Sequence, residues 1–133
     1  MPEYRLPIRV YIEDTDAGGI VYYVNYLKYF ERARTELIRS LGVDKTAVME
    51  DGSVFVVTSA SINYHAPARL DDQLESVAEV VSSGAATIEF RQSVVRSGVE
   101  LATGQVMVAL TDGSSEKPKR MPKGLRELLT LSA

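Results

Sequence analysis

The second half of the chain alternates between apolar and polar residues with a period of two, and this pattern constrains the fold most. Four alternating segments follow one another from Val54 to Leu110, and turn-forming residues separate them. Period two is the repeat of a β-strand that has one buried face. Successive strands with short connections pair in the antiparallel direction. We therefore predict an antiparallel sheet that includes residues 54–64, 74–81, 88–94 and 101–110.

One long amphipathic helix is predicted before these strands, over residues 25–41. Its apolar stripe repeats every three or four residues, as Tyr26, Phe30, Ala33, Leu37 and Leu41. Asn25 can cap the start of this helix, and Gly42 can end it. The pattern also predicts a first strand over Ile8–Ile12, a short helical stretch over 44–50 and a C-terminal helix from Pro122 to about Leu131. One helix on an antiparallel sheet is an α+β fold, whose uncovered face must be polar or meet a partner.

Length and charge limit the functions that this chain can have. Its 133 residues predict one domain over 1–133, and its net charge of −3 argues against a general nucleic-acid or anionic-membrane binder. The chain has no cysteine and a single histidine, His65, which excludes a cysteine nucleophile and a zinc site built on several histidines. No apolar run approaches the ~20 residues of a transmembrane helix. We expect a cytoplasmic protein without membrane insertion.

The residues between the first strand and the helix combine several features of a catalytic site. Glu13, Asp14 and Asp16 place three carboxylates within four residues. Gly18 and Gly19 follow them, shortly before the helix start. A helix N-terminus offers unpaired N–H groups and a partial positive charge, which stabilise an oxyanion, and a nearby carboxylate can act as base or nucleophile. The combination indicates an acyl-transfer site that needs no serine, cysteine or histidine.

The spacing of these carboxylates leaves alternatives open. In an extended segment Asp14 and Asp16 point to the same side, so alternation does not choose between them, although Asp16 is nearer the helix start. The carboxylates could instead be turn or capping residues. They could also hold calcium, but the pattern of alternate ligands ending in a bidentate Glu is absent. His65 fits the end of a strand better than a catalytic role.

Three segments of the chain carry a family resemblance that covers almost its whole length. They are RVYIEDTDAGGIVYYVNYLKYFERARTE (9–36), NYHAPARLDD (63–72) and KPKRMP (117–122). The chain resembles the 4-hydroxybenzoyl-CoA thioesterase family of hotdog-fold enzymes, and within it the Tol-Pal system-associated acyl-CoA thioesterases. The resemblance implies an antiparallel sheet wrapped around one long central helix. It also implies hydrolysis of an acyl-CoA to a carboxylic acid and CoA.

The resemblance implies roles for individual residues. The essential carboxylate of the family falls on Asp16, and the N–H that polarises the thioester carbonyl falls at or next to Tyr23. Gly18 and Gly19 would let the substrate carbonyl approach the backbone closely, and Val24 would also contact the substrate. This chain departs from many members of the branch, which have His where it has Tyr23, and the departure argues against a mechanism that needs an imidazole there. Other family members carry an aromatic residue at this position, so the Asp-based mechanism does not fall. Neither a metal nor a redox cofactor is implied.

An acyl-CoA substrate also implies a site for the CoA phosphates. Basic side chains should receive them, with Lys117, Lys119 and Arg120 as the candidates and Arg91 and Arg69 as weaker ones. The three C-terminal residues could equally form a solvated stretch. Hotdog relatives pair their sheets edge to edge into homodimers and often into homotetramers, with active sites between subunits.

Two other functions stay open for a hotdog chain. A non-catalytic domain could hold an acyl group or dock on a cell-envelope complex, but it would not need Asp16. A dehydratase of the same fold typically uses a His on the helix, and the predicted helix contains none.

Overall fold

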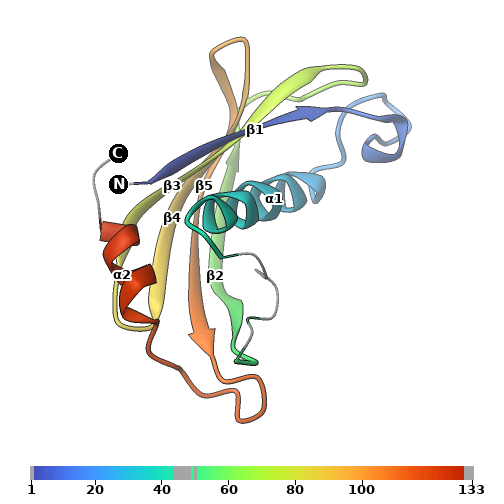
Figure 1. Cartoon of the computed structure of the whole chain (residues 1–133). Helices are drawn as coiled ribbons and strands as arrows, with labels where there is room; N and C mark the ends of the chain where they lie inside the picture. Colours follow the sequence, from blue (N-terminus) through green and yellow to red (C-terminus); the bar gives the residue numbers. More distant parts are fainter. Residues whose placement is uncertain (1, 44–48, 50, 131–133) are drawn as a thin grey trace.

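Five strands form one antiparallel sheet in the order β1-β3-β4-β5-β2 (Figure 1). The computed structural model describes residues 2–43, 49 and 51–130. The strands are β1 (Glu3–Arg9), β2 (Val54–Tyr64), β3 (Gln73–Ser83), β4 (Thr87–Arg96) and β5 (Val99–Thr111). β2 to β5 lie where the alternating segments predicted them, which confirms the α+β class and the antiparallel pairing.

The first strand lies earlier in the chain than the predicted Ile8–Ile12. β1 ends at Arg9, and residues Ile12–Asp14 form a single 3₁₀ turn instead. β1 pairs antiparallel with β3 and places Pro7 opposite Glu75. Proline is tolerated there because β1 is an edge strand, where a missing N–H need not interrupt the sheet.

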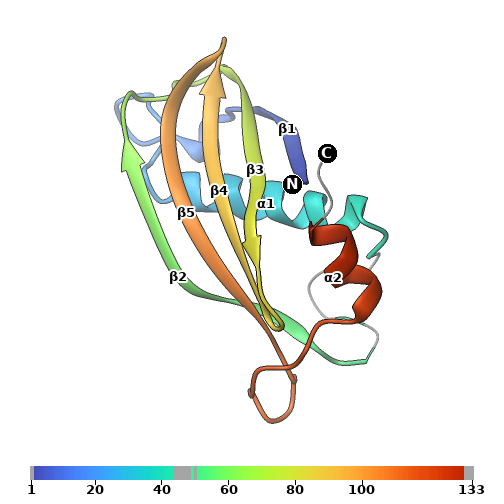
Figure 2. The ribbon, with the colours of Figure 1, turned by 90° about the vertical axis from the view of Figure 1, so that its left-hand side faces the viewer.

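The helix α1 (Asn25–Ser40) packs against one face of the sheet, on β1, β3 and β4 (Figure 2). It has 16 residues and starts where the apolar stripe predicted it. Its residues Phe30, Ala33 and Leu37 are completely buried against the sheet. Gln92 of β4, also buried, accepts from Arg34 and donates to the Phe30 carbonyl at 2.8 Å. A polar link therefore joins the helix to the centre of the sheet.

A short second helix, α2 (Lys123–Thr130), follows the last strand and contacts β3. It starts one residue after Pro122, in agreement with the predicted C-terminal helix, and buries Leu125 and Leu129. Leu131 and nearly all of the helical stretch predicted over 44–50 lie outside the described residues. No helix of the described residues is long and apolar enough to span a membrane.

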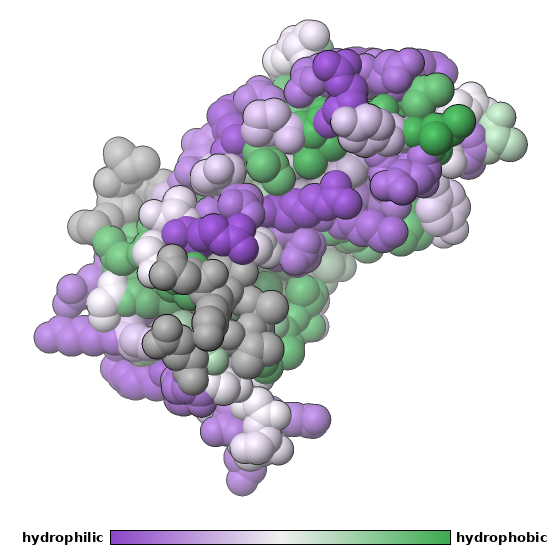
Figure 3. Space-filling view, turned by 45° about the vertical axis from the view of Figure 1, so that its right-hand side comes forward, coloured by the Kyte–Doolittle hydropathy of each residue, from purple (hydrophilic) through white to green (hydrophobic). Residues whose placement is uncertain are grey.

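The face of the sheet away from α1 is polar, and the two edge strands of the described sheet, β1 and β2, each pair with one neighbour only. Ion pairs between Arg5 and Glu75 and between Arg91 and Glu100 lie on that face. Such charged side chains suit a sheet face that is in contact with water. Among the described strands, β2 pairs only with β5, so its other edge has no neighbour. Most of its side chains are exposed, including Val57 at 51%. Figure 3 shows exposed hydrophobic surface among hydrophilic side chains on one side of the molecule.

Candidate functional site

Asp16 lies in a tight turn that the surrounding backbone holds on two sides. Within the turn, the Asp16 N–H donates to the Ile20 carbonyl at 3.0 Å, and the Gly19 N–H donates to the Asp16 carbonyl at 3.1 Å. Outside it, the Val21 N–H donates to the Ala68 carbonyl at 2.8 Å. Gly19 has a φ of +75°, a conformation that favours glycine. The Gly-Gly pair thus lets the chain reverse and leaves Asp16 exposed to solvent.

The carboxylate of Asp16 makes one hydrogen bond to the described residues. Its Oδ1 accepts from the Gly18 N–H at 2.9 Å. This local bond orients the side chain at the surface of the turn and leaves the second oxygen without a partner among the described residues. A carboxylate that is oriented and accessible in this way can reach a substrate.

Asp14, in contrast, is held by several hydrogen bonds within the protein. Its carboxylate accepts from the Tyr11 N–H at 2.9 Å, and its carbonyl accepts from the Tyr22 N–H at 2.9 Å and from Asn25 Nδ2 at 2.7 Å. Asp14 ends the 3₁₀ turn, so the expectation of an extended segment with Asp14 and Asp16 on one side is wrong. Asp14 therefore anchors the loop to the helix start. This agrees with the alternative that the carboxylates are turn or capping residues.

Asn25 does not cap α1, in contrast to the prediction. The capping position is Val24, which makes no side-chain capping bond, and Asn25 is the first helical residue. The Asn25 side chain is buried and turns back to the Asp14 carbonyl. It therefore fixes the loop rather than the free N–H groups of the helix.

The start of α1 presents two backbone donors that the protein does not use. A series of i→i+3 bonds precedes the helix, in which Tyr22, Tyr23 and Val24 accept from the N–H groups three residues later. In the part of the chain that the structure describes, the N–H groups of Tyr23 and Val24 have no hydrogen-bond acceptor. Both lie at the positive end of the helix dipole, where a developing negative charge is stabilised.

An open, mostly apolar groove of ≈ 380 Å³ lies beside these donors. Its lining residues come from the site loop, from the helix start and from the end of β2, and they are Ile20, Val21, Tyr23, Tyr26, Tyr64, His65, Ala66 and Pro67. The Tyr26 hydroxyl accepts from the Ala68 N–H at 3.0 Å. His65 follows the last residue of β2 and contacts the Thr103 hydroxyl at 2.9 Å, as expected for a strand-end residue.

A buried tyrosine lies behind the loop. Tyr29 is 1% exposed, and its hydroxyl has no hydrogen-bond partner among the described residues. Burial, together with the nearby negative charge of Asp14, raises the pKa of Tyr29 well above its ordinary value. The phenol is therefore neutral and does not serve as a base.

The segment that follows β5 and contains the predicted phosphate-binding residues lies at the opposite end of the sheet from the loop between β1 and α1 (Figure 2). The Lys119 N–H donates to the Leu110 carbonyl, whereas the groove residue His65 bonds to the Leu101 carbonyl of the same strand. These two carbonyls are nine positions apart along β5, which corresponds to about 30 Å of strand. Lys117 and Arg120 are exposed beside Lys119. One chain therefore does not bring Lys117, Lys119 or Arg120 to its own Asp16.

The basic candidates also differ in their ion pairs and in their distance from the site loop. Lys119 forms an ion pair with Asp51 at 2.8 Å, and Arg91 pairs with Glu100 on the polar face of the sheet. Arg69 is exposed and pairs through its backbone with Ile20, next to the Asp16 turn. Of the five residues considered from the sequence, only Arg69 adjoins the loop in the same chain.

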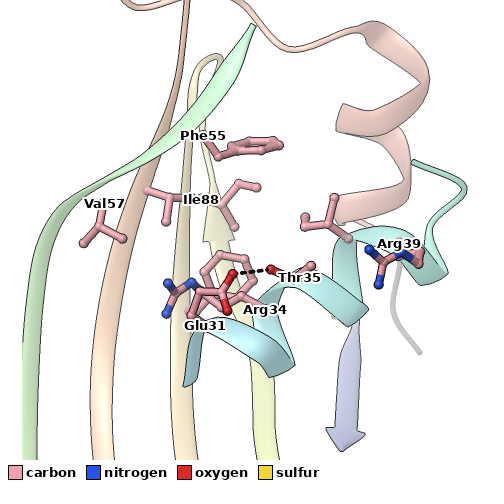
Figure 4. Close-up of a pocket in the computed structure, with 10 residues that line it drawn as sticks. Glu31, Arg34, Thr35, Arg39, Phe55, Val57 and Ile88 are labelled. Atoms are coloured by element: carbon pink, nitrogen blue, oxygen red, sulfur yellow. Dashed lines mark hydrogen bonds between the residues drawn. The ribbon is translucent and has the colours of Figure 1, made fainter. Parts of the chain in front are cut away.

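A larger hollow of ≈ 470 Å³ lies between α1 and β2 and contains none of the predicted site residues (Figure 4). Phe55, Val57 and Ile88 point into it from the sheet, and Glu31 and Arg34 point into it from the helix. Burial lowers the pKa of Arg34 below its ordinary value, while the charge of Glu31 acts in the opposite direction. The hollow is apolar on the strand side and charged on the helix side. No group of three or more metal-ligating side chains occurs among the described residues, here or elsewhere.

Comparison with known proteins gives consistent relatives. Residues 10–129 match the family model described as the thioesterase-like superfamily. The acyl-CoA thioester hydrolase YbgC of Escherichia coli O6:H1 is 41% identical over 123 residues, which cover 92% of each chain. The acyl-CoA thioesterase YbgC of Haemophilus influenzae is 42% identical over 124 residues, which cover 92% of this chain and 91% of that one. The crystal structure of a probable thioesterase from Bartonella henselae superposes with a TM-score of 0.80 at 32% identity, covering 92% of this chain and 100% of that one.

Proposed function

The chain belongs to the thioesterase-like superfamily and is an acyl-CoA thioesterase of the hotdog type, and we propose that Asp16 is its catalytic carboxylate. Its substrate is an acyl-CoA, and its products are a carboxylic acid and CoA. The observation that supports Asp16 is that its carboxylate is exposed in the turn that precedes the helix start, whereas Asp14 is held in backbone contacts. We propose further that residues 1–133 form one cytoplasmic hotdog domain with α1 as its central helix, and that hydrolysis needs no cofactor.

The chemistry proposed for Asp16 has two forms. As a nucleophile, its carboxylate attacks the thioester carbonyl, and water then hydrolyses the resulting anhydride. As a general base, it takes a proton from the water that attacks the same carbonyl. In both forms the thiolate of CoA leaves, but the nucleophile must lie against the carbonyl carbon, whereas the general base must leave room for one water.

The oxyanion formed in either step needs hydrogen-bond donors. We propose that the N–H of Tyr23, with that of Val24 beside it, binds this oxygen at the positive end of α1. Gly18 and Gly19 carry no side chains that would block the approach of the substrate carbonyl to the turn. The apolar groove next to Tyr23 would receive the part of the substrate that adjoins the thioester.

The position of the basic segment supports a site shared between two chains. β2 runs from the Asp51–Lys119 ion pair to Tyr64 at the groove, and its outer edge is open. Antiparallel pairing of two β2 edges would place the first residues of one strand beside the last residues of the other. We therefore propose a homodimer, or a homotetramer of such dimers, in which Lys117, Lys119 and Arg120 of one chain bind the CoA phosphates of a substrate at Asp16 of the other.

Release of free CoA tests the proposed function. The protein is incubated with acyl-CoA substrates of increasing chain length and an aryl-CoA, and a thiol reagent reports the CoA that is released. Steady release with at least one substrate is expected. Binding of acyl-CoA without release would instead identify a non-catalytic hotdog module.

A further inference from the structure

We propose that Tyr64 is a positioning residue that holds the peptide groups at the start of α1 in the orientation that binds the thioester oxyanion. The proposal rests on the function proposed above for this site. One long-range contact carries it: the Tyr64 hydroxyl donates to the Tyr23 carbonyl at 3.2 Å, although 41 residues separate them in sequence.

This contact acts on a peptide group that contains one of the free donors. The Tyr23 carbonyl and the Val24 N–H belong to the same planar peptide, so a bond to the carbonyl also fixes the direction of the N–H. The preceding peptide is held in the same way, because the Tyr22 carbonyl accepts from the Asn25 N–H at 2.8 Å. Each unused donor is therefore oriented through the carbonyl of its own peptide.

The two restraints differ in origin. The bond from Asn25 is part of the helix start itself, whereas Tyr64 reaches across from the end of β2. The Tyr26 N–H also bonds to the Tyr23 carbonyl, but at 3.3 Å, so two long bonds share this acceptor. Without Tyr64, only the local bond from Tyr26 would orient the peptide of Val24.

The surroundings of Tyr64 favour a fixed donor. Its ring packs edge-on against those of Tyr23 and Tyr26, at centroid distances of 6.1 and 5.4 Å. Burial, with smaller effects of Tyr23 and Tyr26, raises the pKa of the Tyr64 hydroxyl, which therefore keeps its proton at neutral pH. Oriented donors stabilise a transition state because they do not have to rotate when the charge develops. Tyr64 should accordingly affect turnover more than substrate binding.

The variant Tyr64→Phe tests this role, since it removes the hydroxyl and keeps the ring. We expect kcat for acyl-CoA hydrolysis to fall about 5- to 20-fold, less than the ~10²-fold or more lost with a whole oxyanion donor. KM should stay within about 2-fold of wild type, as for an interaction made in the transition state. Amide hydrogen exchange at Tyr26, whose N–H donates to the same Tyr23 carbonyl, should become faster when measured by NMR on the same sample.

Tyr4→Phe is the matched control, because the Tyr4 hydroxyl of β1 has no hydrogen bond to the described residues. It should leave kcat, KM and the exchange rate at Tyr26 unchanged. If Tyr64→Phe keeps wild-type kcat, or changes KM alone, the positioning role is wrong while the proposed function stands. If the wild-type protein releases no CoA from any acyl-CoA, the proposed function fails and the positioning role fails with it.

Discussion

Asp14 and Asp16 stand two residues apart but have different surroundings. The Asp14 carboxylate accepts from the Tyr11 N–H within the loop, and its carbonyl accepts from the Tyr22 N–H and the Asn25 side chain, which ties the loop to the helix start. Asp16 makes one side-chain bond, inside its own turn, and remains exposed. Because a catalytic group must reach the substrate, these contacts favour Asp16 for chemistry and Asp14 for structure.

Gly19 should be sensitive to substitution even though there is room for a side chain. An added Cβ would meet nothing within 4 Å, but the φ of +75° is strained for alanine. We expect Gly19→Ala to lower the free energy of unfolding by about 1 kcal/mol, the cost of a left-handed conformation. Urea unfolding measures this change.

Gly124→Ala is the control for that measurement, because its Cβ also meets nothing within 4 Å but lies in the helix α2. Alanine is the better helix former, so this variant should be as stable as wild type or more stable. Equal destabilisation by the two substitutions would show that backbone conformation is not what matters at Gly19.

At the residue scale, the sequence predicted which residues gather at the loop but not how they are connected. Asp16, Gly18, Gly19 and Tyr23 could be selected because they are neighbours in the chain and match a family motif. The contact of Tyr64 with Tyr23 could not be selected, because it depends on how the end of β2 meets the helix start. Only a three-dimensional structure gives such a contact.

At the scale of elements, alternation located the strands well wherever one face is buried. β4 shows this clearly, since Ile88, Phe90, Gln92 and Val94 are all buried on one face as predicted. The pattern was less informative for the two edge strands. β1 contains Pro7, and the pairing of β2 shifts register between Val57 and Ser59, which interrupts strict alternation.

The contact between α1 and β5 requires a glycine in the strand. A Cβ on Gly104 would lie 2.4 Å from the Ser61 carbonyl oxygen and 2.8 Å from the Phe30 ring. We expect Gly104→Ala to destabilise the protein by about 2 kcal/mol or more, because the backbone of β2 cannot move away easily. Thermal and urea unfolding measure the loss.

The neighbouring variant Gln105→Ala provides the comparison on the same strand. Gln105 is exposed, so its replacement should change stability by no more than ~0.5 kcal/mol. A Gly104→Ala protein as stable as Gln105→Ala would contradict the close packing of α1, β2 and β5.

At the scale of the whole molecule, we expect at least a dimer formed through β2. Light scattering at micromolar concentration should give a mass of at least twice the 14.6 kDa of the chain. Val57→Lys, on the open edge, should weaken the assembly because a charged edge strand resists pairing. Val99→Lys, at an equally exposed site on β5, should not. An active preparation that is monomeric would contradict this arrangement.

The basic segment should act on CoA binding rather than on chemistry. Replacing Lys119 and Arg120 by Gln should raise KM for an acyl-CoA and have a weaker effect on an acyl-pantetheine, which lacks the nucleotide phosphates. Lys28→Gln, on the exposed side of α1, serves as the control. It should change KM neither for the acyl-CoA nor for the acyl-pantetheine. Equal effects on both substrates would show that Lys119 and Arg120 do not bind phosphate.

The central claim is that Asp16 performs the hydrolysis, and turnover of Asp16→Asn tests it most directly. Asparagine keeps the shape of the side chain and removes its charge and basicity, so acyl-CoA should still bind. We expect kcat to fall at least ~10³-fold, in the upper part of the range for losing a general base. Asp14→Asn, measured beside it, should cost far less turnover and some stability. A folded Asp16→Asn protein with near wild-type kcat, together with an inactive but folded Asp14→Asn protein, would contradict the assignment and the oxyanion site built on it.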